Sequence, residues 1–185
     1  VQLENENKEL KNTVNQIKTN INNCSNITNT INNSGTITNN NIVLIGYGME
    51  DIKKIDKNDI LKSLKRGFYS TIHLTEAVHF NPKYPEYHNV YISNIKDKYG
   101  MMYDGKDWKL LTKSELIDKI YNKKKDLIES EFDDFYFKLT QSQKNALERW
   151  MNTDDEHDKI KEVKERIKLL LYNKRKMVMG LKEDS

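Results

Sequence analysis

The chain has 185 residues, 36% of them hydrophobic and 32% charged, with a formal net charge of +3, and this length predicts one globular domain with attached segments. No run approaches the roughly 18 consecutive apolar residues of a membrane-spanning helix, and the N-terminus lacks the basic-then-apolar order of a signal peptide. Because the single cysteine, Cys24, excludes an intrachain disulfide and no zinc-finger set of Cys and His is present, we expect an intracellular protein with no cofactor and no membrane contact.

The first 24 residues carry a heptad pattern, with key positions at alternating spacings of four and three, as in a left-handed coiled coil. Asn7 falls at an a position, where it would fix the register, while β-branched residues at both core positions favour trimers. The pattern predicts a parallel coiled coil that joins identical chains as a dimer or trimer. An amphipathic helix packed on its own domain is the alternative. The residues that carry the prediction are Leu3, Asn7, Leu10, Val14, Ile17, Ile21 and Cys24.

Residues 25–41 are dominated by Asn, Thr and Ile. In an extended chain Ile27, Ile31 and Ile37 would share one face, which favours a β-forming neck that intertwines between the same identical chains. A flexible Asn-rich linker is the alternative. We expect the neck to extend the oligomer contact through its isoleucines.

The composition changes at residue 42, where an apolar run follows the Asn-rich tract, and this change predicts a domain boundary. Residues 42–45, with the sequence Ile-Val-Leu-Ile, predict a short buried strand that ends at the glycine-rich segment 46–48. That segment contains only half of a dinucleotide-binding fingerprint, because no third glycine follows. Glu50 and Asp51 are typical of first-turn charges at a helix N-terminus.

Two helices are predicted next. Asp56 or Asn58 can cap the first, which runs to about Arg66 and stops at Gly67. Ser70 can cap the second. Its apolar positions are Ile72, Leu74, Ala77 and Val78.

Three alternating segments, around residues 90–92, 99–103 and 108–111, predict a β-meander with a turn at Asp104-Gly105. Thr112 or Ser114 then caps a long helix. Further helices are expected around residues 141–152 and 155–173. These patterns predict a mostly helical α+β protein. It has four parts: a coiled coil at 1–24, a neck at 25–41, an α+β module at 42–135 and C-terminal helices at 136–185.

Several short motifs together resemble a known module. They are Ile45–Asp51, His79–Asn81, Pro85–Glu86, His88–Asn94, and Tyr103–Gly105 with Trp108. In order and spacing, over residues 1–135, they resemble the C-terminal module of proteins of giant nucleocytoplasmic DNA viruses of the mimivirus type. Such modules often follow a zinc finger, which this chain lacks, a coiled coil and an Asn-rich spacer. The resemblance implies a viral protein located in the host cytoplasm, the virus factory or the virion, and it transfers no catalytic residue.

A cluster of His and Asn side chains lies in the proline-containing segment before the first predicted strand. His79, Asn81, His88 and Asn89 are the residue types that a divalent-metal-dependent HNH-like nuclease uses to hold a metal ion and orient water. The order of elements differs from such nucleases, because here a helix comes first and the strands follow. We therefore favour the interpretation that these side chains hydrogen-bond backbone groups and shape a rigid loop, and we assign no catalytic and no metal-binding residue.

The C-terminal helices carry the excess positive charge. Apolar residues of segment 155–173 fall on one helical face, which leaves its basic side chains on the other. Such a face can bind the phosphates of a nucleic acid or can simply be solvated. The nucleic-acid-binding candidates are Lys164, Lys168, Lys174, Arg175 and Lys176.

Taken together, these features predict a non-enzymatic homo-oligomeric scaffold or adaptor that presents several copies of one binding domain. Its partner would be itself, together with other viral proteins or nucleic acid. The predicted partner-binding residues are Tyr84, Tyr87 and His88, because tyrosines on a proline-stiffened loop lose little entropy on binding. Packing of the two tyrosines within the domain is the alternative.

Overall fold

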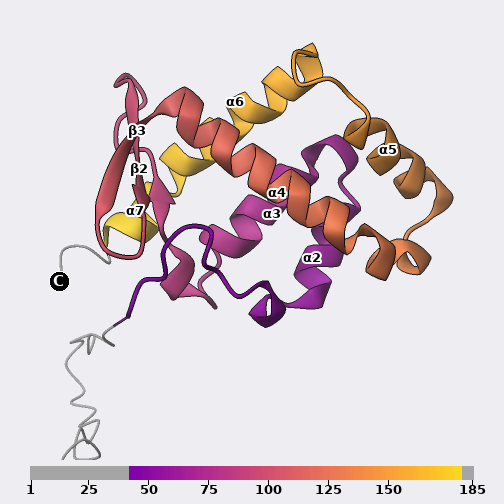
Figure 1. The fold of residues 1–185 in the computed structure, drawn as a ribbon, viewed down its shortest axis with the longest axis horizontal. Helices are drawn as coiled ribbons and strands as arrows, with labels where there is room; N and C mark the ends of the chain where they lie inside the picture. The colour runs from indigo at the N-terminus through magenta and orange to yellow at the C-terminus, as the bar shows by residue number, and fades with distance from the viewer. Residues whose placement is uncertain (1–41, 181–185) are drawn as a thin grey trace, which may run out of the picture. The chain divides into compact units, whose positions relative to one another are not determined.

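The computed structural model describes residues 42–180, so the predicted coiled coil and neck, including every residue from Leu3 to Ile37 assigned to oligomerisation, lie outside the described residues. It shows a mostly helical α+β domain with a three-stranded antiparallel sheet (Figure 1), which confirms the predicted fold class. The helices are α2 (Lys57–Leu64), α3 (Ser70–His79), α4 (Lys113–Phe135), α5 (Gln141–Met151), α6 (Asp158–Asn173) and α7 (Arg175–Met179). The strands β1 (Val90–Tyr91), β2 (Tyr99–Tyr103) and β3 (Trp108–Thr112) are neighbours in chain order.

Local capping sets the start of both α2 and α4. The Asp56 carboxylate accepts a hydrogen bond from the amide two residues further on, and Thr112 forms a reciprocal capping box with Glu115. Both caps agree with the sequence pattern. The predicted Ser70 cap is wrong: Ser70 is the first residue of α3, and its hydroxyl donates to the carbonyl of Leu64 (3.3 Å).

Residues 42–45 form no strand, so this prediction is also wrong. The Ile45 amide donates to the carbonyl of Glu86 (2.8 Å), whereas the Tyr47 amide donates to the carbonyl of Tyr103 (2.8 Å). Because the two bonds run to different parts of the chain, they cannot build a ladder. The apolar run is therefore an irregular segment that is exposed at its first two residues.

The sheet packs one of its faces on α4. A Cβ built on Gly100 in β2 would lie 2.4 Å from Leu116 Cδ2 of α4, so glycine permits this close approach. The turn between β2 and β3 contains Gly105 at φ +100°, and the Asp104 carboxylate accepts hydrogen bonds from the two amides after that glycine. The predicted meander is confirmed.

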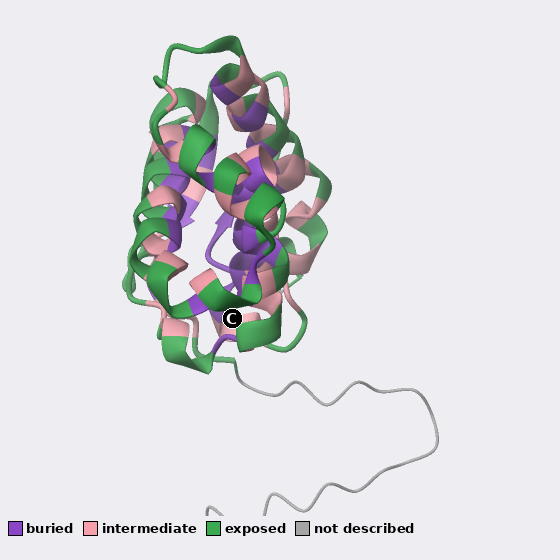
Figure 2. Cartoon of the chain, turned by 90° about the vertical axis from the view of Figure 1, so that its right-hand side faces the viewer, coloured by how far each residue is buried: buried purple, intermediate pink, exposed green. Residues whose placement is uncertain are grey.

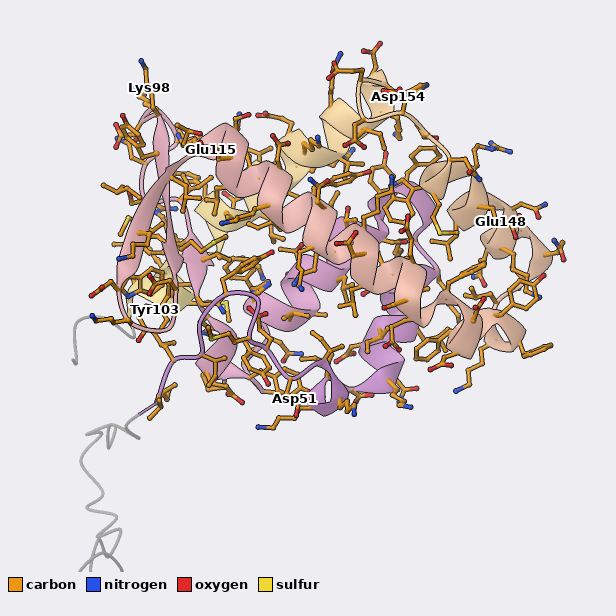
Figure 3. The ribbon with its side chains drawn as sticks, in the orientation of Figure 1. Asp51, Lys98, Tyr103, Glu115, Glu148 and Asp154 are labelled. Atoms are coloured by element: carbon orange, nitrogen blue, oxygen red, sulfur yellow. The ribbon has the colours of Figure 1, made fainter. Side chains whose placement is uncertain are left out.

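The hydrophobic core lies around α4, against which α3 and α6 both pack. Buried residues lie on the inward faces of the helices (Figure 2), while Lys98, Glu148 and Asp154 point away from the core (Figure 3). None of the helices between residues 42 and 180 is both long and apolar enough to span a bilayer.

The C-terminal helices belong to the same compact unit as the rest of the described chain. Trp150 of α5 is fully buried, and its indole N–H donates to the hydroxyl of Tyr121 in α4 (3.2 Å). The Ile92 amide after β1 donates to the carbonyl of Leu171 in α6 (3.4 Å). Segments 42–135 and 136–180 therefore share one core instead of forming separate bodies.

Gly46 should be intolerant of any side chain. A Cβ at this position would lie 2.7 Å from backbone atoms of Asp104 and Gly105, which cannot rotate away as a side chain can. We expect Gly46→Ala to lower the free energy of unfolding by about 1–3 kcal/mol, measured by urea denaturation. Val43→Ala, at a site 78% exposed, is the control and should change it by less than about 0.5 kcal/mol. Equal effects of the two substitutions would show that the β2–β3 turn yields without strain.

Candidate functional site

Five polar side chains from four segments meet inside the domain, and we call them the buried polar cluster: Tyr47, Glu50, His79, Asn89 and Lys124. His79 and Asn89 are fully buried, Lys124 is 1% exposed, and the Glu50 side chain is 3% exposed. Tyr47 contributes a buried hydroxyl. Such groups are rarely buried without partners, because each loses its hydration.

Glu50 is held by hydrogen bonds to both of its carboxylate oxygens. Oε1 accepts from Asn89 Nδ2 (2.8 Å), and Oε2 accepts from the Gly48 amide (2.8 Å). Gly48 has φ +88°, a left-handed conformation that suits glycine. The second Nδ2 hydrogen of Asn89 donates to the carbonyl of Ile45 (3.0 Å), so both amide hydrogens are used and the orientation of the amide is fixed.

His79 is a neutral histidine with one defined tautomer. Its Nδ1 donates to the carbonyl of Tyr87 (3.2 Å), which leaves Nε2 as a lone-pair acceptor. Burial, and after it the positive charge of Lys124, lower the pKa of His79 well below its usual value. The imidazole stacks on the Tyr47 ring at a centroid distance of 5.2 Å, and Nδ1 lies 3.8 Å from Glu50 Oε1.

Lys124 lies on the inward face of α4, with Nζ 5.6 Å from the centroid of the Tyr47 ring. This ammonium donates no hydrogen bond to a described residue and forms no ion pair with one. Burial lowers the pKa of Lys124 to about 8, and the attraction of the Glu50 carboxylate opposes that shift. Burial, and secondarily Glu50, raise the pKa of Tyr47. The cluster therefore combines a carboxylate, a neutral imidazole, a neutral phenol and an amine that loses its proton readily.

Three further atoms of the cluster have no hydrogen-bond partner among the described residues: Tyr47 Oη, His79 Nε2 and Asn89 Oδ1. Native proteins nearly always satisfy buried polar atoms with protein groups, ordered water or a ligand. The His79 imidazole and the Lys124 ammonium both lie against the Tyr47 ring, so the unpartnered groups belong to one cluster.

Two surface hollows, both lined by Gly48, border the cluster. One, of about 320 Å³, is lined by Glu50 and Lys124, and the other, of about 440 Å³, is lined by Tyr47. Lys123 and Asp126 of α4 line both. The first hollow thus brings two positive and two negative groups to its wall, and their formal charges cancel.

The loop residues singled out in the sequence take two different roles. His79 and Asn89 belong to the buried polar cluster. His88 Nε2 donates to the carbonyl of Asn81 (3.0 Å), and Asn81 Oδ1 accepts from the Lys83 amide (3.0 Å), as the loop-shaping interpretation expects. Between residues 42 and 180 no three His, Cys, Asp or Glu side chains are grouped as metal ligands. The enclosed imidazole of His79 also lacks the access that a base acting on a nucleic acid needs.

The predicted partner-binding surface does not agree with the positions of its residues. Tyr87 is 1% exposed and His88 is 4% exposed, so neither can contact a partner. The Tyr87 hydroxyl accepts from the Asp51 amide (3.1 Å), and the half-buried Tyr84 hydroxyl accepts from the Asp56 amide (3.0 Å). Both tyrosines pack within the domain and fasten the segment that leads into α2.

Most candidate nucleic-acid-binding residues are paired within the domain. Lys164 lies 3.0 Å from Asp118, Lys168 donates to Glu165 (2.6 Å) and Lys174 lies 2.9 Å from Glu76; these are N···O distances. Local carboxylates therefore offset much of the predicted basic face.

The other two candidates differ. Arg175 donates to the Tyr172 carbonyl (2.8 Å) and stacks on its ring, while Lys176 is exposed. Nucleic-acid binding by these residues stays a prediction.

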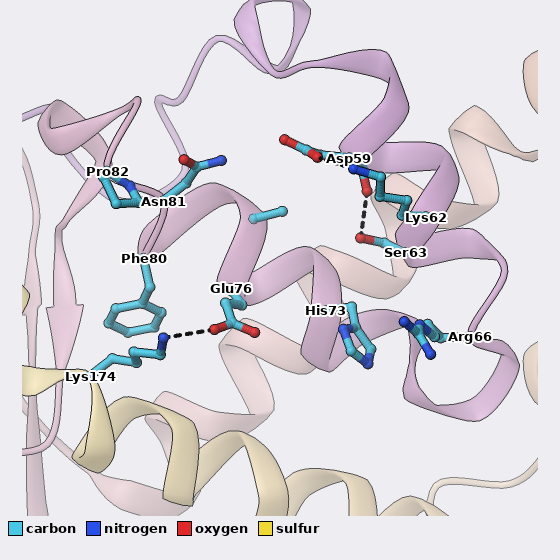
Figure 4. A pocket seen from close by; sticks show the side chains of 11 residues that line it. Asp59, Lys62, Ser63, Arg66, His73, Glu76, Phe80, Asn81, Pro82 and Lys174 are labelled. Atoms are coloured by element: carbon cyan, nitrogen blue, oxygen red, sulfur yellow. Dashed lines mark hydrogen bonds and ion pairs between the residues drawn. The ribbon is translucent and has the colours of Figure 1, made fainter.

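A third hollow, of about 360 Å³, lies between α2, α3 and Lys174 (Figure 4). Four of its charged side chains form two ion pairs, in which Lys174 lies 2.9 Å from Glu76 and Lys62 lies 3.3 Å from Asp59. The buried hydroxyl of Ser63 donates to the Asp59 carbonyl (2.8 Å). No unsatisfied buried atom lines this hollow, which makes it a weaker candidate than the buried polar cluster.

Sequence analysis missed Lys124, Tyr47 and the role of Glu50. Asp51, and not Glu50, caps the short 3-10 turn Ile52–Lys54. Lys124 did leave a signal, because it follows Ile117, Ile120 and Tyr121 at helical spacing on the apolar stripe of α4. A lysine on such a stripe is buried with the apolar residues unless the helix turns about its own axis, so this spacing indicates a buried Lys124.

Comparison with protein-family models, with curated proteins and with solved structures finds no match to this chain.

Proposed function

We propose that the described domain binds a small uncharged polar molecule in the hollow lined by Lys124 and Glu50. The observation that carries this proposal is the Lys124 side chain, which is 1% exposed, lines this hollow and has no hydrogen bond or ion pair to a described residue. A bound molecule would supply a hydrogen-bond acceptor for this ammonium.

The class of ligand follows from the charges and hydrogen-bonding capacity of the hollow. Because Glu50 and Asp126 offset Lys123 and Lys124, a net charge on the ligand would remain uncompensated. Lys123 and Lys124 offer donors, whereas the carboxylates of Glu50 and Asp126 offer acceptors. A molecule with a carbonyl or ether oxygen and several hydroxyl or amide hydrogens matches this set.

In the complete chain, we propose that this domain is the presented unit of a non-enzymatic homo-oligomeric scaffold. The support is the N-terminal heptad, which predicts a dimer or trimer and would multiply each weak ligand contact through avidity. Location in the host cytoplasm, virus factory or virion, and contact with other viral proteins, follow only from the resemblance to giant-virus modules and stay predictions.

Binding can be tested by NMR titration of the full chain with glycerol, ribose and acetamide. The Gly48 amide and the Asn89 side-chain amide, both bonded to Glu50, are the reporters. We expect saturable shifts in the parent and in Lys65→Met, a control at an exposed lysine, and no such shifts in Lys124→Met. If none of the three compounds shifts these amides in the parent, the ligand-binding proposal is wrong.

Assembly is a separate test, made by light scattering on the full chain. We expect a mass two or three times the 21.9 kDa of one chain. Val14→Asp combined with Ile17→Asp should reduce the mass to that of one chain, because both substitutions place charge in the predicted seam. Asn12→Asp, outside the seam, should not. A parent that is monomeric would contradict the scaffold proposal and leave ligand binding unaffected.

A further inference from the structure

The amine of Lys124 differs from the exposed lysines of the described chain in its surroundings. It is 1% exposed, lines the 320 Å³ hollow and has neither a hydrogen bond nor an ion pair from a described residue. The exposed Lys109 and the half-buried Lys159 instead lie against carboxylates, which raise their pKa values. Lys124 therefore combines burial, lack of a partner and contact with a space that a small molecule can enter.

We propose that Lys124 Nζ forms a reversible imine with a small uncharged aldehyde or ketone bound in this hollow. The inference rests on the proposed ligand-binding function and names the reactive class within it. It requires no catalytic turnover, because the covalent bond is itself the mode of binding.

The reaction balances without any further reactant. The neutral amine attacks the carbonyl carbon, a C–N bond forms, and the amine proton moves to the former carbonyl oxygen to give a carbinolamine. That hydroxyl then takes a proton and leaves as one molecule of water while the nitrogen lone pair forms the C=N bond, which gives the protonated imine. Loss of the remaining N–H proton gives the neutral imine and returns the proton that was taken. Addition of water reverses each step.

Two properties of the site favour this chemistry. With a pKa of about 8, roughly a quarter of Lys124 is neutral at about pH 7.5, against roughly one in a thousand for an ordinary lysine. The Glu50 carboxylate lines the same hollow and can act as counter-ion to the protonated imine.

The burial of Lys124 adds selectivity. Because only 1% of Lys124 is exposed, a small aldehyde such as glycolaldehyde can reach it, whereas a large one such as pyridoxal phosphate cannot. Exposed lysines show no such discrimination. Reactivity toward the two aldehydes therefore separates Lys124 from the exposed lysines on the same molecule.

The test treats the full parent chain with glycolaldehyde and sodium borohydride at about pH 7.5, followed by peptide mass mapping. Reduction fixes the imine as a stable hydroxyethyl amine. We expect Lys124 to be labelled roughly tenfold or more above the exposed Lys65 and Lys106, in line with its larger neutral fraction. With pyridoxal phosphate the order should reverse.

Labelling that spreads over the exposed lysines and spares Lys124 would overturn the imine proposal. Glycerol and acetamide cannot form imines, so their effects on the Gly48 and Asn89 amides report binding alone. Shifts from these compounds without a Lys124 adduct would leave the proposed function standing and remove only the imine. If neither the amide shifts nor the Lys124 adduct is observed, the ligand-binding proposal and the imine proposal are both wrong. Since the experiment uses the unaltered chain, no outcome depends on the folding of a variant.

Discussion

Glu50→Ala is expected to lower the free energy of unfolding by about 3–5 kcal/mol, the usual effect of leaving a buried charge without its counter-charge. The substitution removes the acceptor for Asn89 Nδ2 and for the Gly48 amide, and it removes the carboxylate whose charge attracts the Lys124 ammonium. Urea denaturation followed by circular dichroism measures the change. Glu129→Ala, on the exposed face of α4, is the matched control and should alter stability by less than about 0.5 kcal/mol.

A second substitution separates the electrostatic part of this effect from the lost hydrogen bonds. Adding Lys124→Met to Glu50→Ala removes the uncompensated charge while keeping a side chain of similar length. The double variant should therefore be more stable than Glu50→Ala alone, with a coupling of about 0.5–3 kcal/mol. Additive losses would mean that Glu50 and Lys124 do not interact.

The stability of the protein should also depend on pH through Lys124. Its pKa falls from 10.5 to about 8 on folding, so between these values the unfolded chain binds a proton that the folded chain does not. The free energy of unfolding must then rise by about 3 kcal/mol in total for this group as the pH increases from about 8 to 10.5. Lowering the pH back to 8 removes this gain. The measurement is the free energy of unfolding of the parent minus that of Lys124→Met, from about pH 7 to 10.

Taking this difference matters because another group titrates in the opposite sense. Burial raises the pKa of Tyr47, so above about pH 10 the unfolded chain loses the tyrosine proton first, and stability decreases. That contribution is common to the parent and the Lys124→Met variant and largely cancels. A flat difference between the two proteins would show that Lys124 is as well solvated in the folded state as in the unfolded chain.

The predictable part of this fold lies in short-range patterns. Asp56 and Thr112 cap their helices, and the Asp104-Gly105 turn joins two strands, because each depends only on residues a few positions away. Residues 42–45 show the converse. Their composition favours a strand, but a strand needs a neighbouring edge, and the bonds from this part of the chain run to Glu86 and Tyr103.

The candidate site was less predictable for the same reason. His79 and Asn89 stand out in the sequence by residue type, yet their partner Glu50 is 39 positions from Asn89, and Lys124 is on a helix that follows the sheet. No local pattern connects these positions. Tyr87 stood out in the sequence as a partner-binding residue, yet it is buried. A tyrosine on a proline-containing loop can pack in the core or contact a partner at the surface, and its residue type does not distinguish the two.

Ile45 links the way the chain enters the domain to the buried polar cluster. Its amide is bonded to the Glu86 carbonyl, and its carbonyl accepts from Asn89 Nδ2, whose other hydrogen holds Glu50. Any mechanical load that reaches the domain from residue 42 is therefore borne first by these two bonds, ahead of any helix or strand. Tension on this end of the chain would loosen Asn89 before it unfolds the core. By thermodynamic reciprocity, a molecule that stabilises the buried polar cluster would also stabilise the attachment of this end of the chain to the domain.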